Sequence, residues 1–63
     1  MSNRSDTLHR IRRNQNAIKE VTQAIQKVAI TAPYSARVLQ QEKARLLGEV
    51  EQDESLAEVM GWQ

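Results

Sequence analysis

Apolar residues recur at every third or fourth position over residues 8–29, and most of the positions between them are polar. The a and d positions of this heptad pattern, called here the first stripe, are Ile11, Asn14, Ile18, Val21, Ile25 and Val28. A period of 3.5 residues is typical of a helix that packs along its length against another helix. Ser5 and Asp6, just before the pattern, are favoured N-cap types. The pattern therefore predicts a helix over about residues 6–29.

Asn14 is the one polar residue of the first stripe. A buried amide at such a position can fix the register of helix packing, as polar core residues do in coiled coils. The same residue near a frayed helix end would have no such role. The sequence leaves both interpretations of Asn14 open.

A second stripe follows at spacings of three and four, and it consists of Ala36, Leu39, Lys43, Leu46 and Val50. Lys43 interrupts the apolar pattern, but a lysine stem can lie on apolar surface while its ammonium group stays in water. The spacing predicts a second helix over about residues 33–52. Gly48 within it weakens the helix by roughly 1 kcal/mol relative to alanine.

Pro33 separates the two stripes. Proline has no N–H, and its ring would clash with the carbonyl of Ala29 in an unbroken helix. We therefore expect a turn over residues 30–34, where Thr31 or Ser35 could cap the second helix. One long helix kinked at Pro33 is the alternative.

Residues 53–63 are expected to form a separate, short helical tail. Ser55 and Glu58 have the spacing of a capping box, and Gly61 suits the C′ position that ends a helix. The tail carries four large apolar side chains: Leu56, Val59, Met60 and Trp62. They could fold back onto the hairpin or anchor a partner protein, since Trp is enriched at binding hot spots.

The predicted fold class is all-α: a helical hairpin of two antiparallel helices with a short C-terminal helical tail, in one domain spanning residues 1–63. A core in a chain of this length rarely supplies more than about 3–5 kcal/mol. We therefore expect a homodimer in which two hairpins form a four-helix bundle. The expected oligomer interface consists of Ile11, Asn14, Ile18, Val21, Ile25, Val28, Leu39, Leu46 and Val50.

Charge is distributed unevenly, although the net charge is only +1. Residues 1–19 contain five Lys or Arg against one Asp, and residues 49–63 contain five acidic residues and no Lys or Arg. In a hairpin these two ends meet, so Arg10 or Arg13 could pair with Glu49 or Glu51. The outer face of the first helix, called here the basic face, carries His9, Arg12, Arg13, Asn16 and Lys19.

The composition disfavours an enzyme. The chain has no cysteine and one histidine, so it cannot supply the usual nitrogen and sulfur ligands of a zinc site. It has two glycines and no glycine-rich phosphate-binding loop. A short hairpin also offers no pocket in which catalytic groups could assemble. We expect no catalytic, metal-binding or cofactor-binding residues.

The sequence also favours a cytoplasmic protein with no membrane partner. It has no cysteine, no run of about 20 apolar residues and no apolar signal segment near its N-terminus.

Two functions from different classes fit the sequence. The first is a small protein-interaction module (an adaptor, chaperone or inhibitor) that uses a helix face and the apolar tail. The alternative is a nucleic-acid-binding regulatory dimer that sets its basic face against phosphates. The low net charge, the acidic C-terminal part and the scarcity of aromatic residues weigh against the second.

Overall fold

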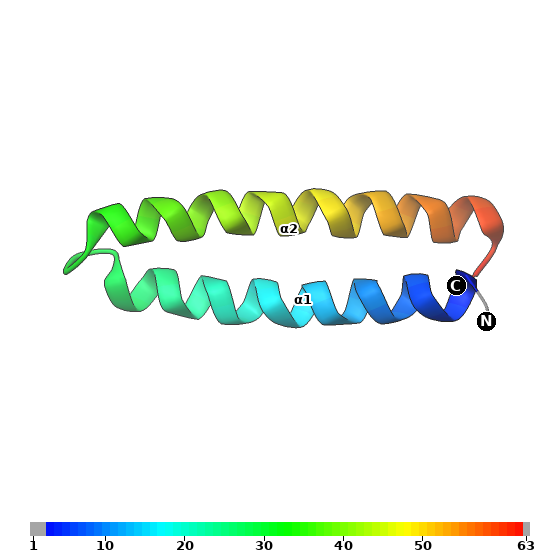
Figure 1. The fold of residues 1–63 in the computed structure, drawn as a ribbon, viewed down its shortest axis with the longest axis horizontal. Helices are drawn as coiled ribbons and strands as arrows, with labels where there is room; N and C mark the ends of the chain where they lie inside the picture. The colour runs from blue at the N-terminus through cyan, green and yellow to red at the C-terminus, as the bar shows by residue number, and fades with distance from the viewer. Residues whose placement is uncertain (1–2, 63) are drawn as a thin grey trace.

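The computed structural model describes residues 3–62, which form two long helices joined by a tight turn. Helix α1 spans Asn3–Val28 and helix α2 spans Pro33–Met60. They lie side by side and antiparallel over almost their whole length (Figure 1), in a rod measuring 44 × 16 × 15 Å. The predicted helical hairpin is confirmed, and the alternative of one long kinked helix is wrong.

The turn occupies residues 29–32, between the two helices. The Ala32 N–H still donates to the Val28 carbonyl at 2.7 Å, so the chain leaves α1 through one more hydrogen-bonded turn. Pro33 is the first residue of α2, where its missing N–H costs nothing. Ala32 precedes it without a side-chain cap, so the expected cap from Thr31 or Ser35 is wrong.

Helix α1 begins at Asn3, three residues earlier than expected. Ser5 and Asp6 therefore lie within its first turn, and the expectation that either is the N-cap is wrong. Asp6 still suits this place, because an acidic side chain is stabilised by the positive end of the helix dipole.

Helix α2 continues without a break to Met60, so the expected end near Gln52 and the separate tail helix are wrong. Ser55 and Glu58 lie inside the helix and form no capping box. No proline or glycine occurs between Gly48 and Gly61 to stop the helix. Residue 63 of the expected tail lies outside the described residues.

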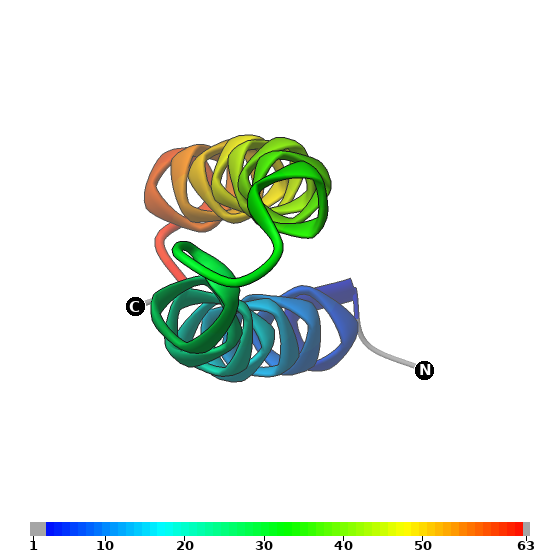
Figure 2. The same cartoon turned by 90° about the vertical axis from the view of Figure 1, so that its left-hand side faces the viewer.

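Gly61 ends α2, so the C′ position expected of it closes the continuous helix and not a separate tail helix. Its φ of 71° and ψ of 32° place it in the left-handed region, which glycine enters without a Cβ penalty. The Gly61 N–H donates to the Glu58 carbonyl at 3.2 Å, and the Trp62 N–H donates to the Ala57 carbonyl at 2.8 Å. These two bonds form a Schellman cap. The described chain after Met60 then leaves α2 in the direction of α1 (Figures 1 and 2).

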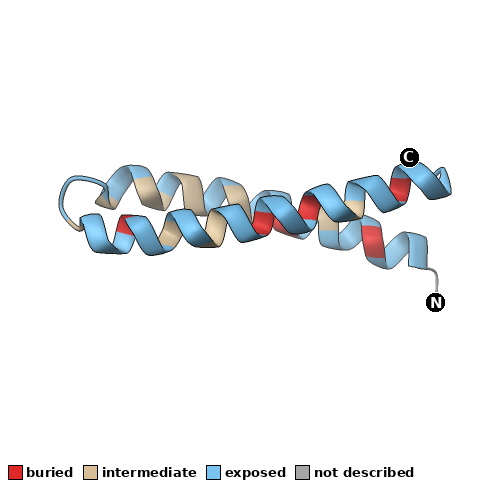
Figure 3. Cartoon of the chain, turned by 90° about the horizontal axis from the view of Figure 1, so that it is seen from above, coloured by how far each residue is buried: buried red, intermediate tan, exposed pale blue. Residues whose placement is uncertain are grey.

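The core of the hairpin is thin. Among residues 3–62, the buried apolar side chains are Ala36, Leu46, Val50 and Ala57, and all four come from α2. The buried residues of α1 are the polar Thr7 and Asn14. Figure 3 shows buried positions as isolated bands on helices that are otherwise half-buried or exposed. Two helices alone therefore leave much of their apolar stripes in reach of water.

Candidate functional site

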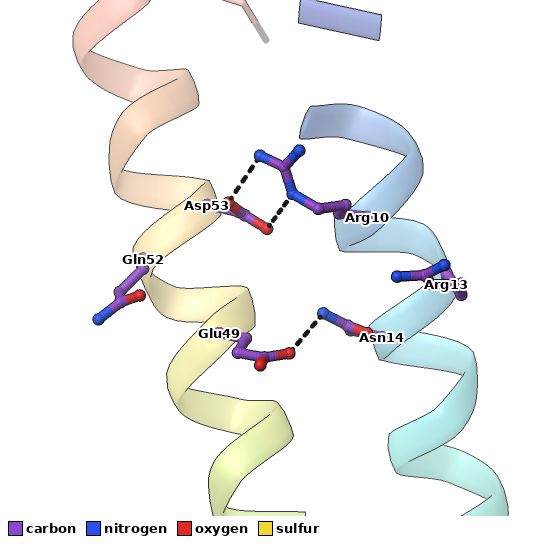
Figure 4. A pocket seen from close by; sticks show the side chains of 6 residues that line it. All are labelled: Arg10, Arg13, Asn14, Glu49, Gln52 and Asp53. Carbon is purple, nitrogen blue, oxygen red and sulfur yellow. Dashed lines mark hydrogen bonds and ion pairs between the residues drawn. The ribbon is translucent and has the colours of Figure 1, made fainter. Parts of the chain in front are cut away.

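A polar cluster joins the two helices near the end of the hairpin that lies away from the turn (Figure 4). The Arg10 guanidinium donates from Nε and from Nη2 to the two carboxylate oxygens of Asp53, both at 3.3 Å. The same Nη2 atom donates to the Thr7 hydroxyl at 3.2 Å. Thr7 is almost completely buried, so this bond satisfies a polar group that water does not reach. The cluster therefore connects the first turns of α1 to the last turns of α2.

Asn14 extends this cluster one turn further along the hairpin. It is only 7% exposed, and its amide Nδ2 donates to the Glu49 carboxylate at 3.3 Å. Glu49 accepts a second bond from Arg45 at 2.8 Å, and Arg45 also binds Glu42. Asn14 is thus a buried amide bonded across the helix interface, and it does not lie near a frayed helix end.

These bonds shift the proton affinity of three side chains. The hydrogen bonds and charge of Asp53 raise the pKa of Arg10 above its ordinary value. Hydrogen bonding by Arg45 lowers the pKa of Glu42, and the same bond, with the charges of Glu42 and Glu49, raises the pKa of Arg45. Both guanidinium groups and the Glu42 carboxylate are therefore stabilised in their charged forms.

The expected intrachain ion pairing is present with a different partner. Arg10 pairs with Asp53 rather than with Glu49 or Glu51. Arg13 borders the shallow depression that Asp53 and Glu49 also line. In Figure 4, Gln52 lines the same depression but points away from α1.

The residues expected at an oligomer interface all lie on the inner surfaces of the hairpin. Asn14, Leu46 and Val50 are buried, and the other six are half-buried: Ile11, Ile18, Val21, Ile25, Val28 and Leu39. The stripes therefore pack within one chain, and six of the nine keep part of their surface exposed.

A groove opens between the helices on the side opposite to the polar cluster. Its apolar part consists of Ile18 from α1 and of Leu47 and Val50 from α2. Its polar residues are Gln15, Asn16, Lys19 and Glu54. Leu47 and Glu49 are two residues apart, about 200° around the helix, which places this groove and the polar cluster on different sides.

The end of α2 exposes the apolar residues singled out from the sequence. Leu56 is 43% exposed, Val59 is 83% exposed and Met60 is 55% exposed. They occupy positions i, i+3 and i+4, so they share one face of the helix. Trp62, beyond the cap, is half-buried. The structure therefore brings the first three into one surface, called here the α2-end surface, and covers part of the fourth.

The basic face is exposed throughout, at His9, Arg12, Arg13, Asn16 and Lys19. Asn16 and Lys19 also border the groove, while His9 and Arg12 flank a separate shallow depression with Ser5 and Leu8. Because they are spaced by three and four residues, the five share one outer face of α1, but they do not converge on one pocket.

Sequence reasoning missed Thr7 and Asp53. Thr7 lies seven residues before Asn14, and Asp53 lies seven residues after Leu46, so extending each stripe by one heptad would have included them. Both are polar, and the predicted second helix ends just before Asp53. Its partner, Arg10, could not be chosen from the sequence because pairing depends on how the two helices align.

Within residues 3–62, no three His, Cys, Asp or Glu side chains are grouped so that they could hold a metal ion. In the same described part, neither helix has an apolar stretch of the length needed to cross a membrane.

Comparison of the chain with models of known protein families, with curated proteins and with solved structures finds no match.

Proposed function

We propose that this protein is a small, non-enzymatic protein-interaction module of the cytoplasm, and that the α2-end surface inserts into a hydrophobic groove on a partner protein. The observation that carries this proposal is the exposure of Leu56, Val59 and Met60 on one helical face. Apolar side chains at i, i+3 and i+4 are the anchors by which a helix binds in a groove. Such side chains in water are a liability unless something covers them.

The chemistry around these residues specifies the partner further. Glu51, Glu54 and Glu58 are exposed on the last turns of the same helix, on a different face from the α2-end surface, and no Lys or Arg follows Arg45. A groove with basic residues along its rim would therefore complement the end of α2 in charge. Met60 can adapt to an irregular groove, and Trp62 could add an aromatic anchor beside it.

The proposal includes self-association, in which two hairpins pair to form a four-helix bundle and act together as an adaptor, chaperone or inhibitor. Its support is the thin core, because the half-buried Ile11, Ile18 and Ile25 gain from further burial. Apolar burial stabilises by about 25 cal/mol per Å².

Site-specific crosslinking tests the docking surface. The photoreactive residue p-benzoylphenylalanine replaces Val59 in one variant and Ile30 in a control, since Ile30 is 94% exposed in the turn at the other end. Crosslinking in the native cell should capture a partner from position 59 and not from position 30. The captured protein is then purified, and its affinity is measured by calorimetry.

Val59→Asp should weaken that affinity more than about tenfold, because the variant buries an unpaired carboxylate, while Ile30→Asp leaves it unchanged. Trp62 fluorescence should shift to the blue when the partner binds. The proposal is overturned if position 59 captures nothing, or captures the same proteins as position 30. It is also overturned if Val59→Asp binds as well as the unchanged chain.

A nucleic-acid-binding dimer is the second candidate function, and the full exposure of the basic face favours it. One observation weighs against it: Arg10, which lies beside the basic face, is engaged by Asp53. If nucleic acid is the ligand, replacing Arg12, Arg13 and Lys19 with Glu should abolish binding without unfolding. The affinity should also fall by orders of magnitude between low and physiological salt. We expect weak or no binding to generic DNA and RNA. A sub-micromolar, sequence-selective complex at physiological salt would promote this function over the first.

A further inference from the structure

The two long sides of the hairpin differ in how they are closed. On one side, the Arg10–Asp53 and Asn14–Glu49 bonds span the two helices, so this is called the bridged side. On the other side lies the groove described above, called the open side, where the half-buried Ile18 and the exposed Leu47 meet water above the buried Val50. Leu8 lies two turns before Gln15 on this same side and is also exposed.

The open side is central on the molecule. Leu47 lies in the middle of α2, with 14 residues before it and 13 after it in Pro33–Met60. Ile18, its neighbour across the groove, is also near the middle of α1. A two-fold axis that passes by Leu47 across the rod would therefore superpose two hairpins along their whole length, with their turns at opposite ends. A surface that sits at the midpoint can pair with itself in this way, as isologous interfaces require.

The size of this side also fits a second copy. A face 44 Å long and 16 Å wide offers roughly 700 Å², close to the ~800 Å² per partner of a stable interface. A short helical peptide would cover only part of that length, whereas a copy of the hairpin matches it. The net charge of +1 gives little repulsion between copies, and the groove residues include both a cation, Lys19, and an anion, Glu54.

We propose that the open side is the surface through which two copies of this chain pair, with Leu47 of each copy at the centre of the contact. The bridged side then faces water in the four-helix bundle, and its polar cluster holds each hairpin together. This inference rests on the proposed self-association and names the side that serves it. The α2-end surface lies at the end of the rod and stays free for the partner protein.

The chain supplies a matched control for Leu47. Val38 lies nine residues earlier in α2, which is two and a half turns, so it is on the opposite side of the helix. The two residues are equally exposed, at 47% for Leu47 and 48% for Val38. Leu47→Glu and Val38→Glu therefore make the same chemical change on opposite sides of one helix.

Light scattering after size exclusion, with the purified full chain alone at micromolar concentration, gives the first readout. The unchanged chain and Val38→Glu should have twice the mass of 7.2 kDa, and Leu47→Glu should weaken dimerisation by about 100-fold. A monomeric unchanged chain overturns the self-association itself. If the Leu47→Glu variant is still a dimer, only the choice of side is overturned. The same holds if the Val38→Glu variant is a monomer.

Single cysteines provide a second readout that does not depend on the glutamate variants folding. The chain has no cysteine of its own, so any disulfide reports the introduced residue. Under mild oxidation, Leu47→Cys should form a covalent dimer, because the two-fold axis brings the two positions together, and Val38→Cys should not. Failure of Leu47→Cys to crosslink, or equal crosslinking by Val38→Cys, overturns the proposed pairing.

Discussion

Arg10 on α1 and Asp53 on α2 lie 43 positions apart in the sequence and are joined by two hydrogen bonds of 3.3 Å. The Arg10 side chain is 46% exposed and the Asp53 side chain 16%, so the carboxylate is the more enclosed partner. The pair occurs where the basic start of the chain meets its acidic end. It selects one alignment of the two helices rather than adding much to stability, because water screens exposed pairs.

Reversing this pair tests that interpretation. Arg10→Asp and Asp53→Arg should each lower the melting temperature by a few degrees, because each places two like charges across the interface. The double variant restores attraction and should recover part of the loss. Circular dichroism melts at one protein concentration give all three values. If the melting temperature of the double variant falls by the sum of the two single losses, the pair does not couple the helices.

Replacing Asn14 with leucine should stabilise the hairpin by about 1 kcal/mol, because an apolar side chain gains more from this buried site than an amide does. Glu49 keeps its bond to Arg45, so no buried charge is left alone. Urea unfolding at a fixed protein concentration measures the change. If Asn14→Leu instead unfolds the chain, the Asn14–Glu49 bond contributes stability and not merely alignment.

The two glycines should respond to alanine with opposite signs. At Gly48, inside α2, an added Cβ meets no atom within 4 Å, so Gly48→Ala should stabilise by about 1 kcal/mol. At Gly61 the left-handed φ of 71° remains, so Gly61→Ala should destabilise by about 1 kcal/mol. Thermal unfolding of the two variants checks both predicted changes in stability. Equal effects would contradict the Schellman cap at the end of α2.

Glu42 should titrate below the ordinary range of a glutamate, because Arg45 donates hydrogen bonds to its carboxylate and lowers its pKa. A carboxylate with a lowered pKa stabilises the folded state above its unfolded pKa. This contribution is lost as the pH falls through the folded pKa. Carbon-detected NMR titration of the Glu42 carboxyl group measures the folded-state pKa. In Arg45→Gln the pKa should rise towards that of a free glutamate; an unchanged pKa would show that the bond is not formed in solution.

The sequence by itself determined the helices and the turn between them. Periodicity and the backbone constraint of Pro33 act over a few residues, so they can be read locally. Gly61 could be recognised as a C′ residue for the same reason, although the helix that it ends is the continuous α2. The helix ends were less certain. The second helix was expected to end near Gln52, but no proline or glycine stops it there, and Arg10 bonds to Asp53 just beyond that point.

The tertiary structure alone decided which residues meet and which sides stay open. The pairing of Arg10 with Asp53, and of Asn14 with Glu49, depends on the alignment of α1 with α2. A slip of one heptad would give each side chain another partner. Leu46 and Leu47 are the same residue type at adjacent positions, yet packing buries the first and leaves the second 47% exposed. The physical reason is that two helices enclose only the narrow strip between them, so position around the helix, and not residue type, determines what remains for a partner.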